Sequence, residues 1–189
     1  MSKKAFLLKT AGILGVSAFM LIVPASLIRQ ASSLDRSRKE TEKILQTLAG
    51  QTNAPGQKET EHQEIQSLYE GILMIPKDGL TVPLIKEWNE SSFAPGVYKG
   101  SVNTKDLIVA GHNDPSQLRA LHHLVYGDEV QILDLNQICH TYRVIREETL
   151  QPDEAKKLVD QSGQNWDLTL FTCTFHNLAR WVIRLEEVI

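Results

Sequence analysis

The chain has 189 residues, of which 42% are hydrophobic and 23% are charged, a composition close to that of ordinary globular domains. This length and composition exclude disordered, collagen-like and low-complexity proteins, and leave room for one domain with an additional segment. The net charge of −3 excludes the basic surface that is typical of nucleic-acid-binding domains. Two cysteines are too few for a disulfide framework or a four-thiolate zinc site, although they suffice for one bridge.

An uncharged apolar run, Ala11–Ile28, follows a short N-terminal stretch that carries three lysines and no acid. Eighteen residues of helix span about 27 Å, enough for the core of a bilayer. We therefore expect residues 1–28 to be a signal anchor, with one transmembrane helix bound by membrane lipid. The alternative is cleavage after Val23-Pro24-Ala25, which would leave a chain beginning at Ser26. Positive charges flank both ends of the run, but the short N-terminus favours export of the domain that follows.

Residues 29–70 are expected to form a stalk and linker between the anchor and the main domain. Leu34, Ile44, Leu45 and Leu48 make a thin apolar stripe among charged residues, which is compatible with a surface helix. The stretch Ala49–Gln63 has no apolar periodicity and contains several turn residues, so it is interpreted as a linker.

The remaining residues, 71–189, are predicted to form mostly strands. Short apolar or alternating runs bounded by turn residues predict strands at Ile72–Ile75, Thr81–Ile85, Leu107–Ala110, Val130–Leu133, Ile138–Ile145, Leu168–Thr174 and Arg180–Val188. Asp153–Gln161 follows a proline and begins with acids, which predicts one short helix, and Ser116–Val125 is a short helix or turn. Short strands separated by turns predict a mostly β domain, a closed or partly closed antiparallel barrel with low helical content.

Three residues near the ends of predicted strands have the side chains that nucleophilic catalysis requires. Cys173 lies at the end of one strand, His112 follows Gly111 just beyond another, and Arg180 begins the last strand. A thiol with a pKa of about 8.5 is strongly nucleophilic as the thiolate. A histidine can exchange the proton of a leaving group, and a guanidinium can stabilise an oxyanion or orient a substrate. Spacing alone makes this a weak prediction, because a cysteine at a strand end is more often a small buried hydrophobe.

Three motifs in sequence order make the prediction much stronger. Thr169-Leu170-Phe171-Thr172-Cys173 matches the TLxTC motif of sortases, and Ala110-Gly111-His112 matches their histidine motif. Gly127-Asp128-Glu129-Val130 is similar to the GD-x-V turn and strand of that family. The resemblance runs from about Gly71 to the C-terminus and follows an anchor, as in sortases. The LTLFTCT sequence and the short spacing from Cys173 to Arg180 most resemble class B-type or clostridial-type sortases.

The resemblance implies an eight-stranded sortase barrel, with one or two short helices, outside a Gram-positive cell membrane that the chain crosses once. It implies a cysteine transpeptidase that cleaves an LPxTG-like C-terminal sorting signal of surface proteins between Thr and Gly. Cys173 would be the nucleophile, His112 the general acid and base, Arg180 the stabiliser of the oxyanion or substrate, and Thr172 a substrate-binding position. An amine acceptor, from a peptidoglycan precursor or a pilin lysine, would release the thioacyl enzyme. No cofactor or metal is implied.

Other histidines and arginines are interpreted as structural. Arg184 shares the polar face of the last strand with Arg180, but lies about 13 Å further along it, so it is interpreted as a solvated residue. His122 and His123 are interpreted as structural or surface residues. A zinc site built from His140, His176 and a cysteine lacks the usual spacing of ligands.

Two further alternatives concern Cys139 and the class of protein. Cys139 is interpreted as a core thiol, and a Cys139–Cys173 disulfide, possible outside the cell, would block the predicted nucleophile. A papain-like protease is disfavoured, because its cysteine precedes its histidine in the chain. A non-catalytic, membrane-tethered β-barrel binding module would also explain an anchor, a stalk and strands. Such a module has no need for cysteine, histidine and arginine together at strand ends.

Overall fold

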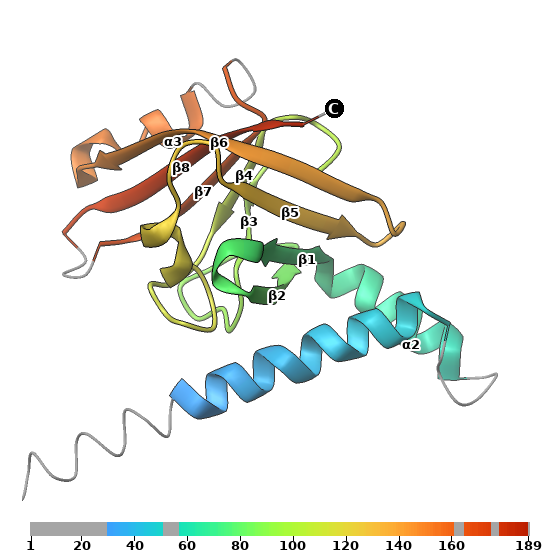
Figure 1. The fold of residues 1–189 in the computed structure, drawn as a ribbon. Helices are drawn as coiled ribbons and strands as arrows, with labels where there is room; N and C mark the ends of the chain where they lie inside the picture. Colours follow the sequence, from blue (N-terminus) through green and yellow to red (C-terminus); the bar gives the residue numbers. More distant parts are fainter. Residues whose placement is uncertain (1–29, 51–56, 161–164, 175–177, 189) are drawn as a thin grey trace, which may run out of the picture.

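A computed structural model describes residues 30–50, 57–160, 165–174 and 178–188 (Figure 1). Within this part the chain forms eight strands: β1 (Tyr69–Ile75), β2 (Leu80–Ile85), β3 (Gly96–Lys99), β4 (Leu107–Ala110), β5 (Glu129–Asp134), β6 (Cys139–Leu150), β7 (Leu168–Cys173) and β8 (Arg180–Glu187). They close into a barrel in the order β1-β2-β3-β4-β7-β8-β6-β5. The prediction of a mostly β, closed barrel is therefore confirmed.

The sequence analysis expected a purely antiparallel barrel, but two pairs of strands are parallel. β4 pairs with β7 in parallel, with Leu107 opposite Leu168 and Ala110 opposite Phe171, and β2 makes a one-residue parallel contact with β3. A parallel pair needs a long crossover connection. The segment between β4 and β7, which contains β5 and β6, provides that crossover.

Alternation along the strands divides the apolar residues into two layers. Val109, Leu170 and Ile183 belong to the main core inside the barrel. Their neighbours in sequence belong to a second cluster on the outer face of the same strands, formed by Ile108, Ala110, Leu150, Leu158, Phe171 and Val182. Consecutive side chains of a strand point to opposite faces, so β4, β7 and β8 are apolar on both sides.

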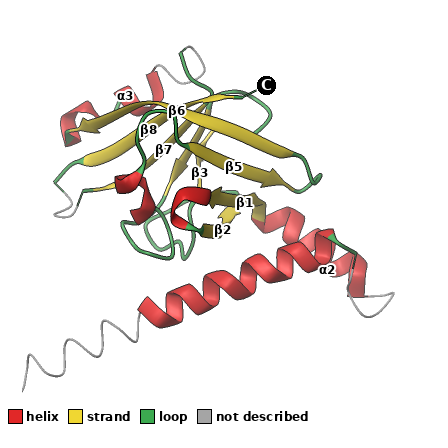
Figure 2. Ribbon diagram, in the orientation of Figure 1, coloured by secondary structure: helices red, strands yellow, loops and turns green. Residues whose placement is uncertain are grey.

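Helices precede the barrel in the stalk, where the sequence analysis allowed a surface helix, and short ones lie between the strands (Figure 2). A long helix covers residues 30–48, and α2 covers Gln57–Leu68, including part of the predicted linker Ala49–Gln63. The predicted helix Asp153–Gln161 is instead a 3-10 turn, Pro152–Glu154, followed by the four-residue α3, Lys157–Asp160. A further 3-10 turn covers Arg119–His123. Residues 57–63 of the predicted linker are therefore helical. The sequence analysis did not predict this helix, because the polar sequence of α2 has little apolar periodicity.

The helix 30–48 packs along the β1–β2 side of the barrel (Figure 1). Ser37, Thr41, Ile44 and Thr47 recur at helical spacing and are buried. Thr41 Oγ1 donates to the carbonyl of Ser37 at 2.9 Å, and Thr47 Oγ1 to that of Lys43 at 3.0 Å. Because these two threonine hydroxyls find partners within the helix, they can be buried beside Ile44. Ser37 Oγ is buried without a hydrogen-bond partner among the described residues.

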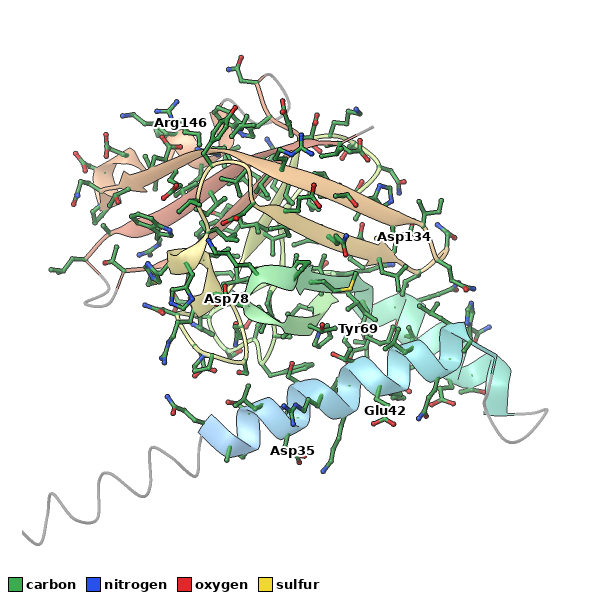
Figure 3. The ribbon with its side chains drawn as sticks, in the orientation of Figure 1. Asp35, Glu42, Tyr69, Asp78, Asp134 and Arg146 are labelled. Carbon is green, nitrogen blue, oxygen red and sulfur yellow. The ribbon has the colours of Figure 1, made fainter. Side chains whose placement is uncertain are left out.

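Polar contacts also join this helix to the barrel. The Tyr69 hydroxyl donates to Glu40 Oε2 at 2.8 Å. Burial is the main cause that raises the pKa of Tyr69 well above its ordinary value, and this hydrogen bond is the second. Gln137 Nε2 donates to the carbonyl of Leu48 at 3.3 Å. Figure 3 shows Asp35 and Glu42 on the opposite side of the helix, pointing away from the barrel. The helix is therefore amphipathic, although its buried face is largely made of serine and threonine.

The membrane segment predicted at Ala11–Ile28, and its alternative cleavage site, lie outside the described residues. Within the described part, none of the helices has the length and apolar character needed to span a bilayer. The boundary between stalk and main domain at residue 70 stays a prediction, although β1 already begins at Tyr69.

Ile44→Ala should lower the free energy of unfolding by about 2–5 kcal/mol, because it leaves a cavity between the helix and the barrel. Ile44 is fully buried beside Ile65, Tyr69 and Ile72, whereas its neighbour Leu45 is 44% exposed. Leu45→Ala is therefore the matched control, with an expected change within about 0.5 kcal/mol. Urea unfolding of both variants measures the difference, and equal stabilities would show that the helix does not pack stably on the barrel.

Candidate active site

Cys173 and Arg180 face each other across the antiparallel β7–β8 ladder. Cys173 is the last residue of β7, Arg180 is the first residue of β8, and the two are register partners. Directly opposed residues of an antiparallel pair have Cβ atoms about 4.5–5.5 Å apart and lie on the same face. The thiol and the guanidinium therefore start from adjacent positions, while Arg184 is opposite Thr169.

His112 reaches the same end of the sheet from the parallel strand β4. Ala110 is opposite Phe171, and the Gly111 N–H donates to the Phe171 carbonyl at 3.2 Å. Continuing this register places His112 beside Cys173. Ala110 and Phe171 both belong to the outer cluster, so alternation puts His112 and Cys173 on the outer face. The structure thus brings together the three residues that the sequence analysis selected, at one end of β4, β7 and β8.

The loop after β4 holds the backbone of His112 in place. The His112 N–H donates to Gln117 Oε1 at 2.9 Å, and the His112 carbonyl accepts from Leu118 N at 3.1 Å. A Cβ on Gly111 would lie 2.6 Å from the Leu118 side chain, so only glycine allows the loop to close this tightly. The His112 ring packs against Trp88, with ring centroids 5.8 Å apart.

Thr172 does not lie where a substrate contact was expected. It is 1% exposed and is the register partner of Trp181, which packs against the interior core. Alternation directs its side chain to the face opposite that of Cys173. Its Oγ1 is buried and has no hydrogen-bond partner among the described residues, so the side chain is not presented to a peptide on the face of Cys173.

His122 is the residue near the nucleophile that the sequence analysis did not select. Its ring packs on Trp181 with centroids 5.4 Å apart, and it hydrogen-bonds with the backbone of Cys173. Burial lowers the pKa of His122, and the hydrogen bond opposes this effect without cancelling it. No spacing in the sequence indicates this contact, because the turn Arg119–His123 reaches β7 only through the tertiary fold.

Replacing His122 by phenylalanine should weaken the loss of stability on acidification. The pKa of His122 is about 6.5 in the unfolded chain and lower in the folded protein. At pH values between these two pKa values, the unfolded state therefore binds more protons than the folded state. The stability that neutral His122 contributes is complete above about pH 6.5 and is lost as the pH falls through the folded-state pKa of this residue. Urea unfolding at pH 7 and pH 5 tests this, with the exposed neighbour variant His123→Gln as control. Equal losses in wild type and His122→Phe would exclude the effect.

Arg184 is not a solvated residue, which corrects the sequence-based interpretation. It is 1% exposed, and its Nε lies 2.8 Å from Glu148 Oε1. Its Nη1 donates to Thr169 Oγ1 at 2.8 Å, and its guanidinium lies 4.3 Å from the centre of the Trp166 ring. Burial lowers the pKa of Arg184, while Glu148 raises it. Arg184 thus ties α3 and the segment before β7 to the outer face of β8.

The second cysteine and the other histidines do not join the site. Cys139 begins β6 and is exposed, not a core thiol, and both cysteines are free, so they form no disulfide. His140 lies beside Glu187, with Nδ1 and Oε1 3.2 Å apart. His176 lies outside the described residues, and the residues that are described contain no group of three or more metal-ligating side chains.

Comparison with known proteins decides the family. A sortase-domain model matches residues 73–188, well over half of the chain. The chain belongs to the sortase family. Sortases are transpeptidases, so this protein is an enzyme, and the matched residues include every strand after β1 and all three residues at the proposed site.

Solved sortases share the fold at low sequence identity. The sortase C structure from Streptococcus pneumoniae is 21% identical with a TM-score of 0.56, and the match covers 64% of this chain and 67% of that one. Sortase C1 from Streptococcus agalactiae is 23% identical with a TM-score of 0.56, covering 87% and 98%. A lid mutant of sortase A from Corynebacterium diphtheriae is 17% identical with a TM-score of 0.58, covering 86% and 95%. No curated protein matches the sequence. These neighbours are of classes C and A, so the resemblance to class B-type sortases stays a prediction.

Proposed function

We propose that this sortase cleaves an LPxTG-like sorting signal and joins the released protein to an amine of the cell wall or of a pilin subunit. The observation that carries the proposal is the β7–β8 register, which sets Cys173 opposite Arg180, with His112 at the same end of β4. These positions coincide with the TLxTC and histidine motifs. A non-catalytic binding module is the alternative, and this clustering of reactive side chains argues against it.

The three side chains support a two-step acyl transfer. The Cys173 thiolate attacks the carbonyl of the scissile bond, Arg180 stabilises the negative charge that develops on the oxygen, and His112 gives its proton to the departing amine. The C–N bond breaks and a thioacyl enzyme remains. An acceptor amine then attacks the thioacyl carbon, the C–S bond breaks, and His112 takes up a proton from the new amide nitrogen.

We also propose that the enzyme stays in the cell membrane through Ala11–Ile28, with its catalytic domain outside the cell. Ser32 lines a pocket that also contains His112, and it follows the end of the apolar run by four residues. Four residues span at most about 14 Å even when fully extended. This distance supports an active site close to the bilayer surface, where membrane-bound sorting substrates are accessible.

The proposal is tested by incubating the detergent-solubilised full chain with a library of sorting-signal peptides and a simple amine. Mass spectrometry should detect a thioacyl adduct on one peptide class, and an amide product after the amine is added. Stable binding of a peptide without cleavage would favour the binding module. N-terminal sequencing of the native protein tests the anchor, because a chain that begins at Ser26 would have been processed.

A further inference from the structure

A pocket of about 450 Å³ lies on the side of His112 that faces the helix 30–48. Its walls include Ser33 and Arg36 from the helix, Phe93 from the loop before β3, and His112 and Asp114 from the loop after β4. Pockets that bind small molecules usually have volumes of about 300–1,000 Å³. The proposed general base is therefore one wall of a cavity that the N-terminal helix completes.

The pocket contains one positive and one negative side chain. The Arg36 guanidinium lies 4.0 Å from the centre of the Phe93 ring, and no carboxylate is within ion-pair distance of it among the described residues. Asp114 Oδ1 accepts from the N–H of Ser116 at 2.8 Å and from its hydroxyl at 2.6 Å. In the part of the chain that is described, the second oxygen of Asp114 has no hydrogen-bond partner. Each group is thus oriented by the protein and still has capacity to bind a ligand.

We propose that this pocket binds the acceptor, and that the acceptor is an amine with a free carboxylate on the same carbon. This proposal rests on the proposed function, because it names the class of amine that releases the thioacyl enzyme. Arg36 offers a planar donor pair that suits a carboxylate, and Asp114 attracts the ammonium form of the neighbouring amine. The simple side-chain amine of a protein lysine has no adjacent carboxylate, so Arg36 would have no partner on it.

His112 lines the pocket and is set next to Cys173 by the β4–β7 register, which accounts for the chemistry of transfer. The bound ammonium first loses one proton to solvent and becomes a nucleophilic amine. Its nitrogen forms a C–N bond with the thioacyl carbon, the C–S bond breaks, and Cys173 leaves as the thiolate. The second proton of the nitrogen passes to His112, which is the wall of the pocket in contact with the amine. The thiolate and the protonated histidine are then ready for the next donor.

Three acceptors with the same carbon spacing between their two amines test the proposal. In 1,5-diaminopentane neither amine is next to a carboxylate, in lysine one is, and in 2,6-diaminopimelate both are. With the full chain and a cleaved donor peptide, kcat/KM for transfer should rise along this series. Tandem mass spectrometry should find the acyl group on the α-nitrogen of lysine. Arg36→Gln should lower the preference for diaminopimelate over diaminopentane by roughly ten- to a hundred-fold, as expected for loss of a charged hydrogen bond.

The controls separate this proposal from the proposed function. Arg38 is exposed on the same helix, and Arg38→Gln should keep the preference. Asp114→Asn retains Oδ1 for Ser116 and removes only the charge, so it should reduce the preference even if Arg36→Gln folds poorly. Equal transfer to all three amines, or equal losses for all three in Arg36→Gln, would overturn the acceptor proposal while leaving donor cleavage in place. Absence of any donor cleavage would instead overturn the proposed function.

Discussion

Cys173→Ala should abolish thioacyl formation and amide transfer while leaving the fold intact. The side chain is only partly buried at the end of β7, so removing one sulfur there creates no large cavity. Without the thiol no covalent intermediate forms, and the expected loss of turnover is the largest of any single substitution, on the order of 10³-fold or more. Mass spectrometry of enzyme trapped with donor peptide measures the intermediate directly.

Cys139→Ala is the matched control for this substitution, because it removes the other free thiol. Cys139 is exposed at the start of β6, where it pairs with Leu133 of β5, on the side of the barrel away from the β4–β7 pair. The variant should retain both adduct formation and transfer. An adduct on Cys139, or full transfer by Cys173→Ala, would contradict the assignment of the nucleophile.

Strands were predictable from the sequence where apolar residues are continuous or alternate between clear turns. Leu107–Ala110 was predicted with the bounds that the structure has, and Arg180–Val188 differs from β8 by one residue. β3 was missed, because Gly96–Lys99 lies between a proline and a glycine and, unlike the wholly apolar Leu107–Ala110, contains a glycine and a lysine. Gly96 is needed there, since a Cβ would lie 2.5 Å from the Ile85 side chain. Local pattern does not reveal such tertiary requirements.

The candidate site was predictable to the extent that it depends on strand ends. Cys173, His112 and Arg180 were selected from motifs and positions, and the register places them at one end of the sheet. The contacts of His122 and of the helix 30–48 were not predictable. His122 reaches Cys173 through a turn that packs on the end of the barrel, and the buried face of the helix contains serine and threonine, which hydropathy counts as polar.

Arg184 shows why alternation alone misassigns polar residues. The sequence places Arg180 and Arg184 on one polar face of β8. Polar residues that alternate with apolar ones along a strand normally face solvent. Here α3 and the segment before β7 cover the outer face, so the carbonyls of Lys157 and Leu158 accept from Arg184 at 3.0 and 3.4 Å. The interpretation of Arg184 as a solvated residue is therefore wrong.

Arg180→Ala should consequently lose activity, whereas Arg184→Ala should lose stability. Arg180 is partly exposed opposite Cys173, and its guanidinium acts when negative charge develops on the carbonyl oxygen. Arg180→Ala should lower kcat by about a hundredfold or more, with a change in unfolding free energy below about 1 kcal/mol. Arg180→Lys should restore little activity, because a single ammonium does not reproduce the planar pair of donors.

Arg184→Ala should instead lower the free energy of unfolding by about 3–5 kcal/mol, because it leaves Glu148 and Thr169 without their buried partner. Arg146, which is labelled in Figure 3, is the control. Its side chain is 59% exposed and pairs with the same carboxylate at 3.1 Å. Arg146→Ala should cost less than about 1 kcal/mol. Denaturant unfolding and kinetics at a temperature where every variant is folded separate the two effects. Normal turnover in Arg180→Ala, or a folded and stable Arg184→Ala with low kcat, would exchange the roles of the two arginines.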